Sequence, residues 1–202
     1  MPAIAKLSGS TMRHCRVNSE WHLAHAVRVL RAGGIVAHAT EGVWGLACDP
    51  ASRVVIQRLL QLKARAVDKG LIVIGASPAD FSGELGRLSA AQRAQVCESW
   101  PGPITWVLPN DRFAGWVTGG RDQVAVRVPG HPQARALCHA FGGPLVSTSA
   151  NLAGRTPARS ALHARRSLRD GVDYFLPGEV LAPSGPSEIR TPAGQRLRSA
   201  TP

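Results

Sequence analysis

A short apolar run ends in a row of polar side chains at Pro144-Leu145-Val146-Ser147-Thr148-Ser149-Ala150-Asn151. The run from Leu145 to Ser147 has the character of a buried strand, and alternate side chains of an extended chain face the same way. Ser147, Ser149 and Asn151 would then point together and offer hydroxyl and amide groups to a ligand. Turn-forming hydrogen bonds at a strand end would explain the same residues, so the spacing alone leaves both interpretations open.

Predicted helices and strands alternate along the chain on both sides of this run, which is typical of an α/β fold whose sheet is covered by helices. Hydrophobic spacing and end signals predict helices over residues 20–32, 53–62, 90–98, 132–141 and 160–169. Strands are predicted over residues 35–37, 71–74, 104–108, 124–128 and 145–147, with short strand candidates over 174–176, 188–190 and 195–198. The neighbouring strands 104–108 and 124–128, with the strand-rich C-terminus, indicate a mixed sheet.

The length of 202 residues suits one domain. We expect a flexible leader over residues 1–18 and a single domain over residues 19–202, with Ser19 capping the first helix. The leader lacks the long apolar segment of a secretory signal, although an organelle transit peptide is an alternative. Four isolated cysteines and the lack of an apolar run of roughly 20 residues predict a reduced, cytoplasmic protein with no membrane helix.

The charge of the chain narrows the classes of partner. Lysine and arginine total 24 against 13 acidic residues, so the formal net charge is +11. Such a surface attracts nucleic acid, nucleotide phosphates or an anionic membrane, and the charge alone does not choose among them. The sequence has no HExxH, GxSxG, GxGxxG or P-loop pattern, and nothing completes a metal set around His22 and His25. We therefore expect no metal site built by the protein.

A second candidate group is Lys63-Ala64-Arg65 with Lys69 close behind, between a predicted helix and a buried strand. Cations that converge at the mouth of a sheet can hold a triphosphate and stabilise its developing charge. A solvated basic helix end would explain the same residues. Two weaker signals are the glycine-containing loop Thr40–Gly45, whose amides could approach an anion, and Arg127 within an apolar strand.

Six segments, taken together and in this order, resemble the YrdC/TsaC family of threonylcarbamoyl-AMP synthases. They are Thr40-Glu41-Gly42-Val43-Trp44-Gly45-Leu46, Lys63-Ala64-Arg65 with Asp68-Lys69-Gly70-Leu71, Trp100-Pro101-Gly102-Pro103-Ile104-Thr105, Val124-Ala125-Val126-Arg127-Val128-Pro129 with His131-Pro132, Ser147-Thr148-Ser149-Ala150-Asn151, and Pro186-Ser187-Glu188-Ile189-Arg190. The resemblance extends over about residues 19–198. One such match would be weak, but six collinear matches are specific.

The resemblance implies a single α/β domain with a twisted, mostly mixed sheet flanked by helices around a basic concave cleft. It implies that L-threonine, bicarbonate or CO2, and ATP react to give threonylcarbamoyl-AMP and pyrophosphate, with Mg²⁺ accompanying ATP. Partner proteins would then transfer the threonylcarbamoyl group to the adenosine beside the anticodon of tRNA, and direct contact with tRNA is possible.

The resemblance also implies roles for individual residues. It assigns catalysis to Lys63, Arg65, Ser149 and Asn151. It places Arg65, Lys69, Ser147, Asn151, Arg155 and Arg198 around ATP. It places Thr40, Arg127, Ser149 and Ser187 around threonine or its carbamate.

The chain departs from the family pattern at several positions. His38-Ala39 stands where the family usually has an aromatic residue and a proline, and Trp44 stands where a tyrosine is usual. Ala66 replaces a usual proline, and Ile74 a frequent histidine. These changes put threonine affinity and amino-acid specificity in question.

Two rival functions are consistent with parts of the sequence. A non-catalytic module that binds tRNA or double-stranded RNA would also use the +11 charge, and its binding would depend steeply on salt. A carbamoyltransferase for hydrogenase maturation contains a similar domain, but within a longer chain that also carries acylphosphatase-like and zinc-finger segments.

Overall fold

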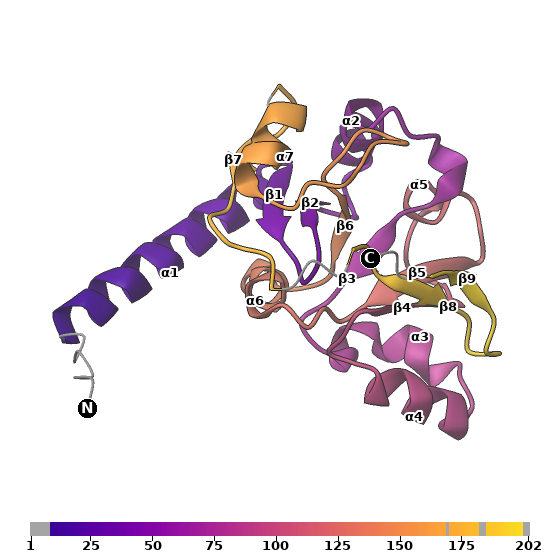
Figure 1. Ribbon diagram of the computed structural model, residues 1–202. Coiled ribbons are helices and arrows are strands. Elements are labelled where there is room, and N and C mark those ends of the chain that lie inside the picture. Colours follow the sequence, from indigo (N-terminus) through magenta and orange to yellow (C-terminus); the bar gives the residue numbers. More distant parts are fainter. Residues whose placement is uncertain (1–8, 169, 182–184, 200–202) are drawn as a thin grey trace.

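Nine strands form one mixed sheet in the computed structural model, which describes residues 9–168, 170–181 and 185–199 (Figure 1). The strands are β1 (Val36–Ala39), β2 (Trp44–Cys48), β3 (Ile72–Ile74), β4 (Ile104–Pro109), β5 (Gln123–Arg127), β6 (Leu145–Ser149), β7 (Tyr174–Phe175), β8 (Glu188–Arg190) and β9 (Arg196–Arg198). Their order across the sheet is β7-β1-β2-β6-β3-β5-β4-β8-β9. Parallel pairs join β1 to β7, β3 to β5 and β4 to β8, and the other neighbours are antiparallel. The predicted mixed sheet is therefore confirmed.

Helices cover both faces of the sheet. They are α1 (Gly9–Arg31), α2 (Arg53–Leu62), α3 (Ser82–Gly86), α4 (Ala90–Glu98), α5 (Gly115–Thr118), α6 (Pro132–Phe141) and α7 (Ala161–Leu168), with 3-10 turns η1 (Val67–Lys69) and η2 (Pro78–Phe81). One apolar core joins α1 and α6 to the sheet, and the larger core joins the remaining helices to its other face. The N-terminal part of α1 projects beyond the sheet (Figure 1).

Local sequence explains the best-predicted helices. The Ser52 hydroxyl accepts from the backbone N–H of Val55 and caps α2, whose buried face includes Val55 and Leu59. Helix α6 begins at Pro132, which needs no backbone donor in the first turn, and ends before Gly142 in the left-handed conformation. These signals are local, so α2 and α6 begin and end where the sequence predicts.

Two predictions about the N-terminal third are wrong in detail. Helix α1 begins at Gly9, so Ser19 lies inside the helix and does not cap it; no proline or glycine interrupts residues 10–18. The predicted leader is therefore partly helical, and its first eight residues lie outside the described chain. The glycine-containing loop is also shorter than predicted, because Trp44 and Gly45 already belong to β2, which the sequence analysis missed.

The central strand β6 is the strand from which the sequence analysis began. It lies between β2 and β3, with Ser147 aligned with Ala47 on one side and with Ile72 on the other. Both alignments are antiparallel, so backbone hydrogen bonds hold β6 along both edges. The polar end of the run is consequently held at a fixed place in the middle of the sheet.

Candidate active site

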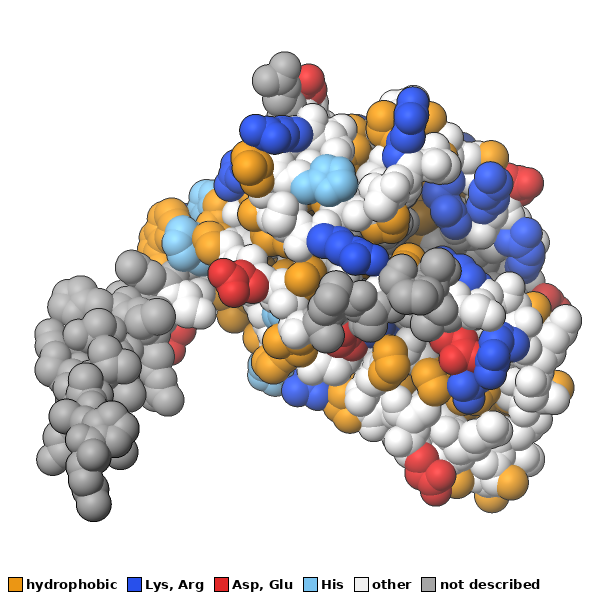
Figure 2. All heavy atoms as spheres, viewed as in Figure 1, with side chains coloured by type: hydrophobic (Ala, Val, Ile, Leu, Met, Phe, Trp, Pro, Cys, Tyr) orange, Lys and Arg blue, Asp and Glu red, His pale blue; other side chains and the backbone are white. Residues whose placement is uncertain are grey.

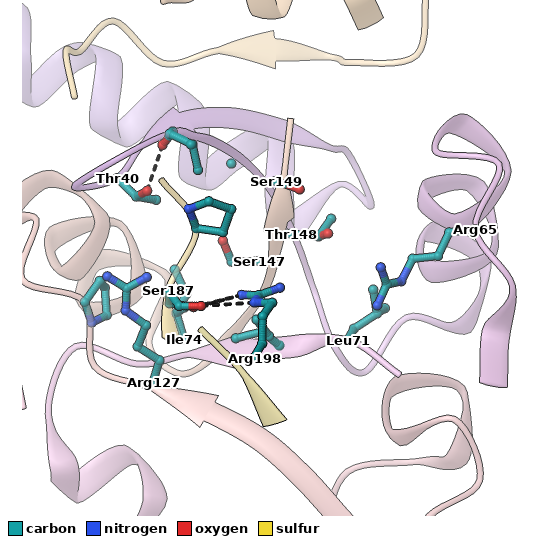
Figure 3. Close-up of a pocket in the computed structure, with 15 residues that line it drawn as sticks. Thr40, Arg65, Leu71, Ile74, Arg127, Ser147, Thr148, Ser149, Ser187 and Arg198 are labelled. Carbon is teal, nitrogen blue, oxygen red and sulfur yellow. Dashed lines mark hydrogen bonds between the residues drawn. The ribbon is translucent and has the colours of Figure 1, made fainter. Parts of the chain in front are cut away.

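A cavity opens at the polar end of β6. Its lining residues come from segments far apart in the sequence and are Thr40, Val43, Gly45, Arg65, Leu71, Ile72, Ile74, Arg127, Pro129, Ser147, Thr148, Ser149, Pro186, Ser187 and Arg198. Figure 3 shows Arg127 and Arg65 on opposite sides of this cavity, with Ser147, Thr148 and Ser149 between them. The fold therefore brings together seven residues that the sequence analysis singled out, namely Thr40, Arg65, Arg127, Ser147, Ser149, Ser187 and Arg198.

The cavity is strongly cationic. Arg65 donates to the carbonyl of Gly70 at 2.8 Å, and Arg198 donates to the carbonyl of Ser187 at 2.7 Å. In these contacts both guanidinium groups bind neutral carbonyl oxygens and not carboxylates. Burial lowers the pKa of Arg198, and the positive charges of Arg65 and Arg127 lower it further. Among the described residues that line the cavity none is acidic. An anionic ligand would relieve this repulsion between like charges.

A second hollow of about 370 Å³ adjoins the cavity and shares Arg65 and Arg198 with it. Lys69 and Arg121 also line this hollow. Basic side chains gather around this side of the molecule, over α2 and α5 (Figure 2). We call Arg65, Lys69 and Arg198 the cationic wall. Together the two spaces reach the volume range of small-molecule sites, and the charged side chains that line them are basic.

Lys63 lies beneath the site instead of in it. Its side chain is buried, and its Nζ donates to the carbonyl oxygens of Ser149 and Asn151 and to Oδ1 of Asn151. Burial, with a smaller contribution from the charge of Arg65, lowers the pKa of Lys63 to about 8. Lys63 therefore holds residues 149–151, which we call the supporting turn, and it does not line the cavity.

The prediction that three polar side chains point together is only partly correct. Ser147 and Ser149 line the cavity, but β6 ends at Ser149 and Asn151 follows in the supporting turn. Asn151 is not a lining residue, because its side chain accepts from Ser149 and Lys63 and donates to the carbonyl of Arg155. The Arg155 side chain is exposed and is not among the lining residues.

An ion pair that the sequence analysis did not single out fixes the opposite wall. Arg127 is nearly buried, and it donates to Glu41 and to the carbonyl of Gly102, the latter at 2.8 Å. Burial lowers the pKa of Arg127, while the charge of Glu41 opposes that shift. Glu41 follows Thr40 in the glycine-containing loop. A single carboxylate next to a candidate binding residue was therefore the only sequence signal for this ion pair.

Metal-binding groups and membrane-spanning helices were both looked for among the described residues. Over residues 9–168, 170–181 and 185–199, no group of three or more His, Cys, Asp or Glu side chains is placed to hold a metal ion. Within the same ranges, no helix combines the length and the hydropathy that a membrane crossing would require.

Comparison with known proteins identifies the family. The Sua5/YciO/YrdC family model, described as telomere recombination, matches residues 28–200. A threonylcarbamoyl-AMP synthase of Nitrosococcus oceani is 47% identical over 180 residues, covering 88% of this chain and 97% of its own. One of Hahella chejuensis is 47% identical over 176 residues, covering 87% and 96%.

Solved structures agree with this result. P. abyssi Sua5 complexed with L-threonine has a TM-score of 0.80 and 29% identity, covering 85% of this chain and 51% of the other. E. coli YciO shares the fold, with a TM-score of 0.72 at 20% identity over 84% of this chain and 82% of the other. The chain therefore belongs to the Sua5/YciO/YrdC family.

Proposed function

We propose that this protein joins L-threonine, CO2 or bicarbonate, and ATP into threonylcarbamoyl-AMP with release of pyrophosphate. The observation that carries the proposal is the single cavity in which hydroxyl groups of β6 face guanidinium groups without a lining carboxylate. The relatives that match almost end to end carry the name of this synthase, and one similar structure contains L-threonine. A non-catalytic RNA-binding module is not favoured.

The reaction needs no serine or cysteine nucleophile. The neutral amine of threonine adds to CO2 and loses one proton to give a carbamate, and a carbamate oxygen then attacks the α-phosphorus of ATP. A new oxygen–phosphorus bond forms, the bond from the α-phosphorus to the bridging oxygen breaks, and pyrophosphate leaves with the bonding electrons. The protein must hold the reactants in line and neutralise phosphate charge.

The cationic wall is suited to the phosphates. Arg65 also has a buried Nε–H with no partner among the described residues, and such a donor is costly unless a ligand accepts from it. We assign Arg65 and Lys69 to the phosphates, and Arg198 and Ser147 to ATP. Arg155 would contact ATP only if its exposed side chain turned toward the cavity.

The other wall is suited to the amino acid. We assign the threonine carboxylate or carbamate to Arg127, with Thr40, Ser149 and Ser187 as hydrogen-bonding neighbours. Among our predicted catalytic residues, Lys63 and Asn151 act by holding the supporting turn, so that Ser149 keeps its place in the cavity. The roles of Lys63 and Arg65 are thus different, although both are basic.

Mg²⁺ would arrive with ATP as part of the substrate. The described lining residues of both spaces are free of carboxylates, so the protein offers no hard-oxygen cage, and the phosphate oxygens would hold the ion. The product would pass to proteins that transfer threonylcarbamoyl to tRNA. We place this work in the cytoplasm.

The deciding experiment measures pyrophosphate release from Mg-ATP after L-threonine and bicarbonate are added to folded protein. We expect release that depends on all three substrates, and mass spectrometry should identify threonylcarbamoyl-AMP. An amino-acid panel in the same assay reports the effect of the His38-Ala39 and Ile74 departures. No release above an ATP-only control would overturn the proposal.

A further inference from the structure

His38 lies directly behind the hydroxyl-bearing wall of the cavity and has no role in the function proposed above. It is fully buried on β1, where it is aligned with Gly45 of β2. Its ring Nε2 lies 3.3 Å from Oγ of Ser147, which lines the cavity. A buried imidazole that does not itself line the cavity therefore contacts one of the cavity hydroxyls.

The partners of the imidazole determine which atom donates. His38 Nδ1 lies 3.1 Å from the carbonyl oxygen of Ala39, and a carbonyl can only accept a hydrogen bond. Nδ1 therefore carries the proton, and Nε2 of the neutral ring is an acceptor. Consequently the Ser147 hydroxyl donates its proton to Nε2.

The imidazole stays neutral over the physiological range. The pKa of His38 is lowered to about 4, mainly by burial and to a smaller extent by His131 and the positive charge of Arg127. The Ala39 carbonyl and the charge of Glu41 act in the opposite direction but do not prevail. Nε2 of His38 can therefore accept a hydrogen bond at neutral pH.

Because the Ser147 hydroxyl donates its proton to His38, this hydroxyl cannot donate a hydrogen bond to a ligand in the cavity. The oxygen can then present only lone pairs to a ligand. Two other lining hydroxyls are committed in the same way, because Thr40 donates to the carbonyl of Val43 at 2.7 Å and Ser149 donates to Oδ1 of Asn151 at 2.6 Å. The cavity thus combines guanidinium donors with neutral oxygen acceptors.

Gly45 is the residue that allows this contact. A Cβ on Gly45 would lie 3.1 Å from both Nε2 of His38 and Oγ of Ser147, which is tighter than nine in ten real Cβ contacts. A side chain at position 45 would press against both atoms of the pair. The imidazole of His38 and the hydroxyl of Ser147 come into contact because Gly45 has no side chain between them.

We propose that His38 is a positioning residue that fixes Ser147 as a hydrogen-bond acceptor, and that Ser147 accepts from an N–H or O–H group of the substrate. The inference deepens the proposed function and rests on it for the identity of the substrates. Two sources of such a donor exist, namely a ribose hydroxyl or the adenine amino group of ATP, and the amine of threonine.

A double-mutant cycle tests the coupling. Ser147→Ala removes the acceptor, His38→Leu removes the group that orients it, and His38→Gln keeps an acceptor at the end of the side chain. We expect either Ser147→Ala or His38→Leu to raise the KM of one substrate by roughly tenfold, the value of one hydrogen bond. The double variant should match the singles, and His38→Gln should regain most of the affinity.

Measuring KM and calorimetric Kd separately for ATP and for L-threonine identifies the donor. A selective rise for ATP assigns the ribose or adenine, and a selective rise for threonine assigns the amine. Additive effects of the two substitutions, or equal losses with His38→Gln and His38→Leu, would show that His38 only fills space and would overturn the inference.

A spectroscopic measurement decides the hydrogen-bond direction without turnover. In protein labelled with ¹⁵N-histidine, the His38 ring should show the Nδ1–H tautomer at neutral pH and should stay neutral down to about pH 4. The Nε2–H tautomer would overturn the inference. If the wild type releases no pyrophosphate, the proposed function fails, while the ring tautomer and the dissociation constants still decide the role of His38.

Discussion

Basic side chains serve opposite purposes at the supporting turn, which Lys63 holds from below, and in the cationic wall. Lys63 and Arg65 are two positions apart, yet Lys63 is buried and gives its ammonium protons to the supporting turn, whereas Arg65 reaches the cavity. The hydrogen bonds of Lys63 are internal to the protein, while Arg65 retains a buried N–H without a partner in the described chain. Position relative to the end of α2 thus separates a structural cation from a ligand-binding one.

The largest expected effect follows from removing the structural cation. Lys63→Met leaves the acceptors of the supporting turn without their donor, which we expect to cost roughly 2–3 kcal/mol of unfolding free energy. Pyrophosphate release should also fall by about 100-fold or more, because Ser149 loses its fixed position. Urea unfolding and the release assay measure the two effects on one preparation.

The matched substitution on the cationic wall should separate activity from stability. Arg65→Ala should lower pyrophosphate release by roughly 100-fold, because it removes a preorganised charge at the phosphates. Unfolding free energy should change by less than about 1 kcal/mol, since the half-buried side chain gives up a hydrogen bond to the Gly70 carbonyl and forms no ion pair in the described chain. If Arg65→Ala lowered the unfolding free energy as much as Lys63→Met, the distinction between a structural and a ligand-binding cation would be wrong.

A pH titration sharpens the comparison further. The pKa of Lys63 is lowered to about 8, so above that pH the folded chain loses a proton that the unfolded chain keeps up to about 10.5. This group therefore makes folding more favourable as pH rises through that interval. Turnover should nevertheless fall severalfold there, because neutral Lys63 gives the supporting turn one donor fewer.

Lys63→Arg provides the control for the titration, since arginine keeps its charge throughout this range. The decline in turnover above about pH 8 should disappear or move upward in this variant. An unchanged decline would assign it to another group, such as the substrate amine.

The smallest effect is expected far from the site. Arg87 and Asp111 form an ion pair whose side chains are largely exposed, at 48% and 72%. Arg87→Ala should change unfolding free energy by less than about 0.5 kcal/mol and leave pyrophosphate release unchanged. A large effect in the same urea and release assays would mean that arginine loss in general, and not the position of Arg65, controls activity.

Sequence reasoning reached the parts of the molecule that are encoded locally. The helices that begin at Arg53 and Pro132 carry their own end signals, and the row of hydroxyl side chains marks the polar end of β6 in the sequence. It missed β2, because a strand beginning inside a glycine-containing loop is stabilised by its neighbours β1 and β6 and not by its own pattern.

The division of labour within the site could not be predicted from spacing. Whether Lys63 faces a ligand or a backbone turn depends on residues 86 and 88 positions away, and the same holds for Arg127 and Glu41. Extended alternation also failed at Asn151, where the chain leaves β6 and turns. In each case a tertiary contact decided the role of a side chain whose chemistry was already evident.

One wall of the cavity belongs to the edge of the sheet. Ser187 precedes β8, and Arg198 ends β9, the outermost strand. Strands at the edge of a sheet have fewer backbone partners than central ones, so we expect the β8–β9 ribbon to open before the central strands do. Because a nucleotide held by Arg198 binds only the docked ribbon, saturation with ATP should slow both amide exchange and proteolytic clipping at the C-terminal end. Amide exchange in β8 and β9 would thus report whether ATP occupies the cavity.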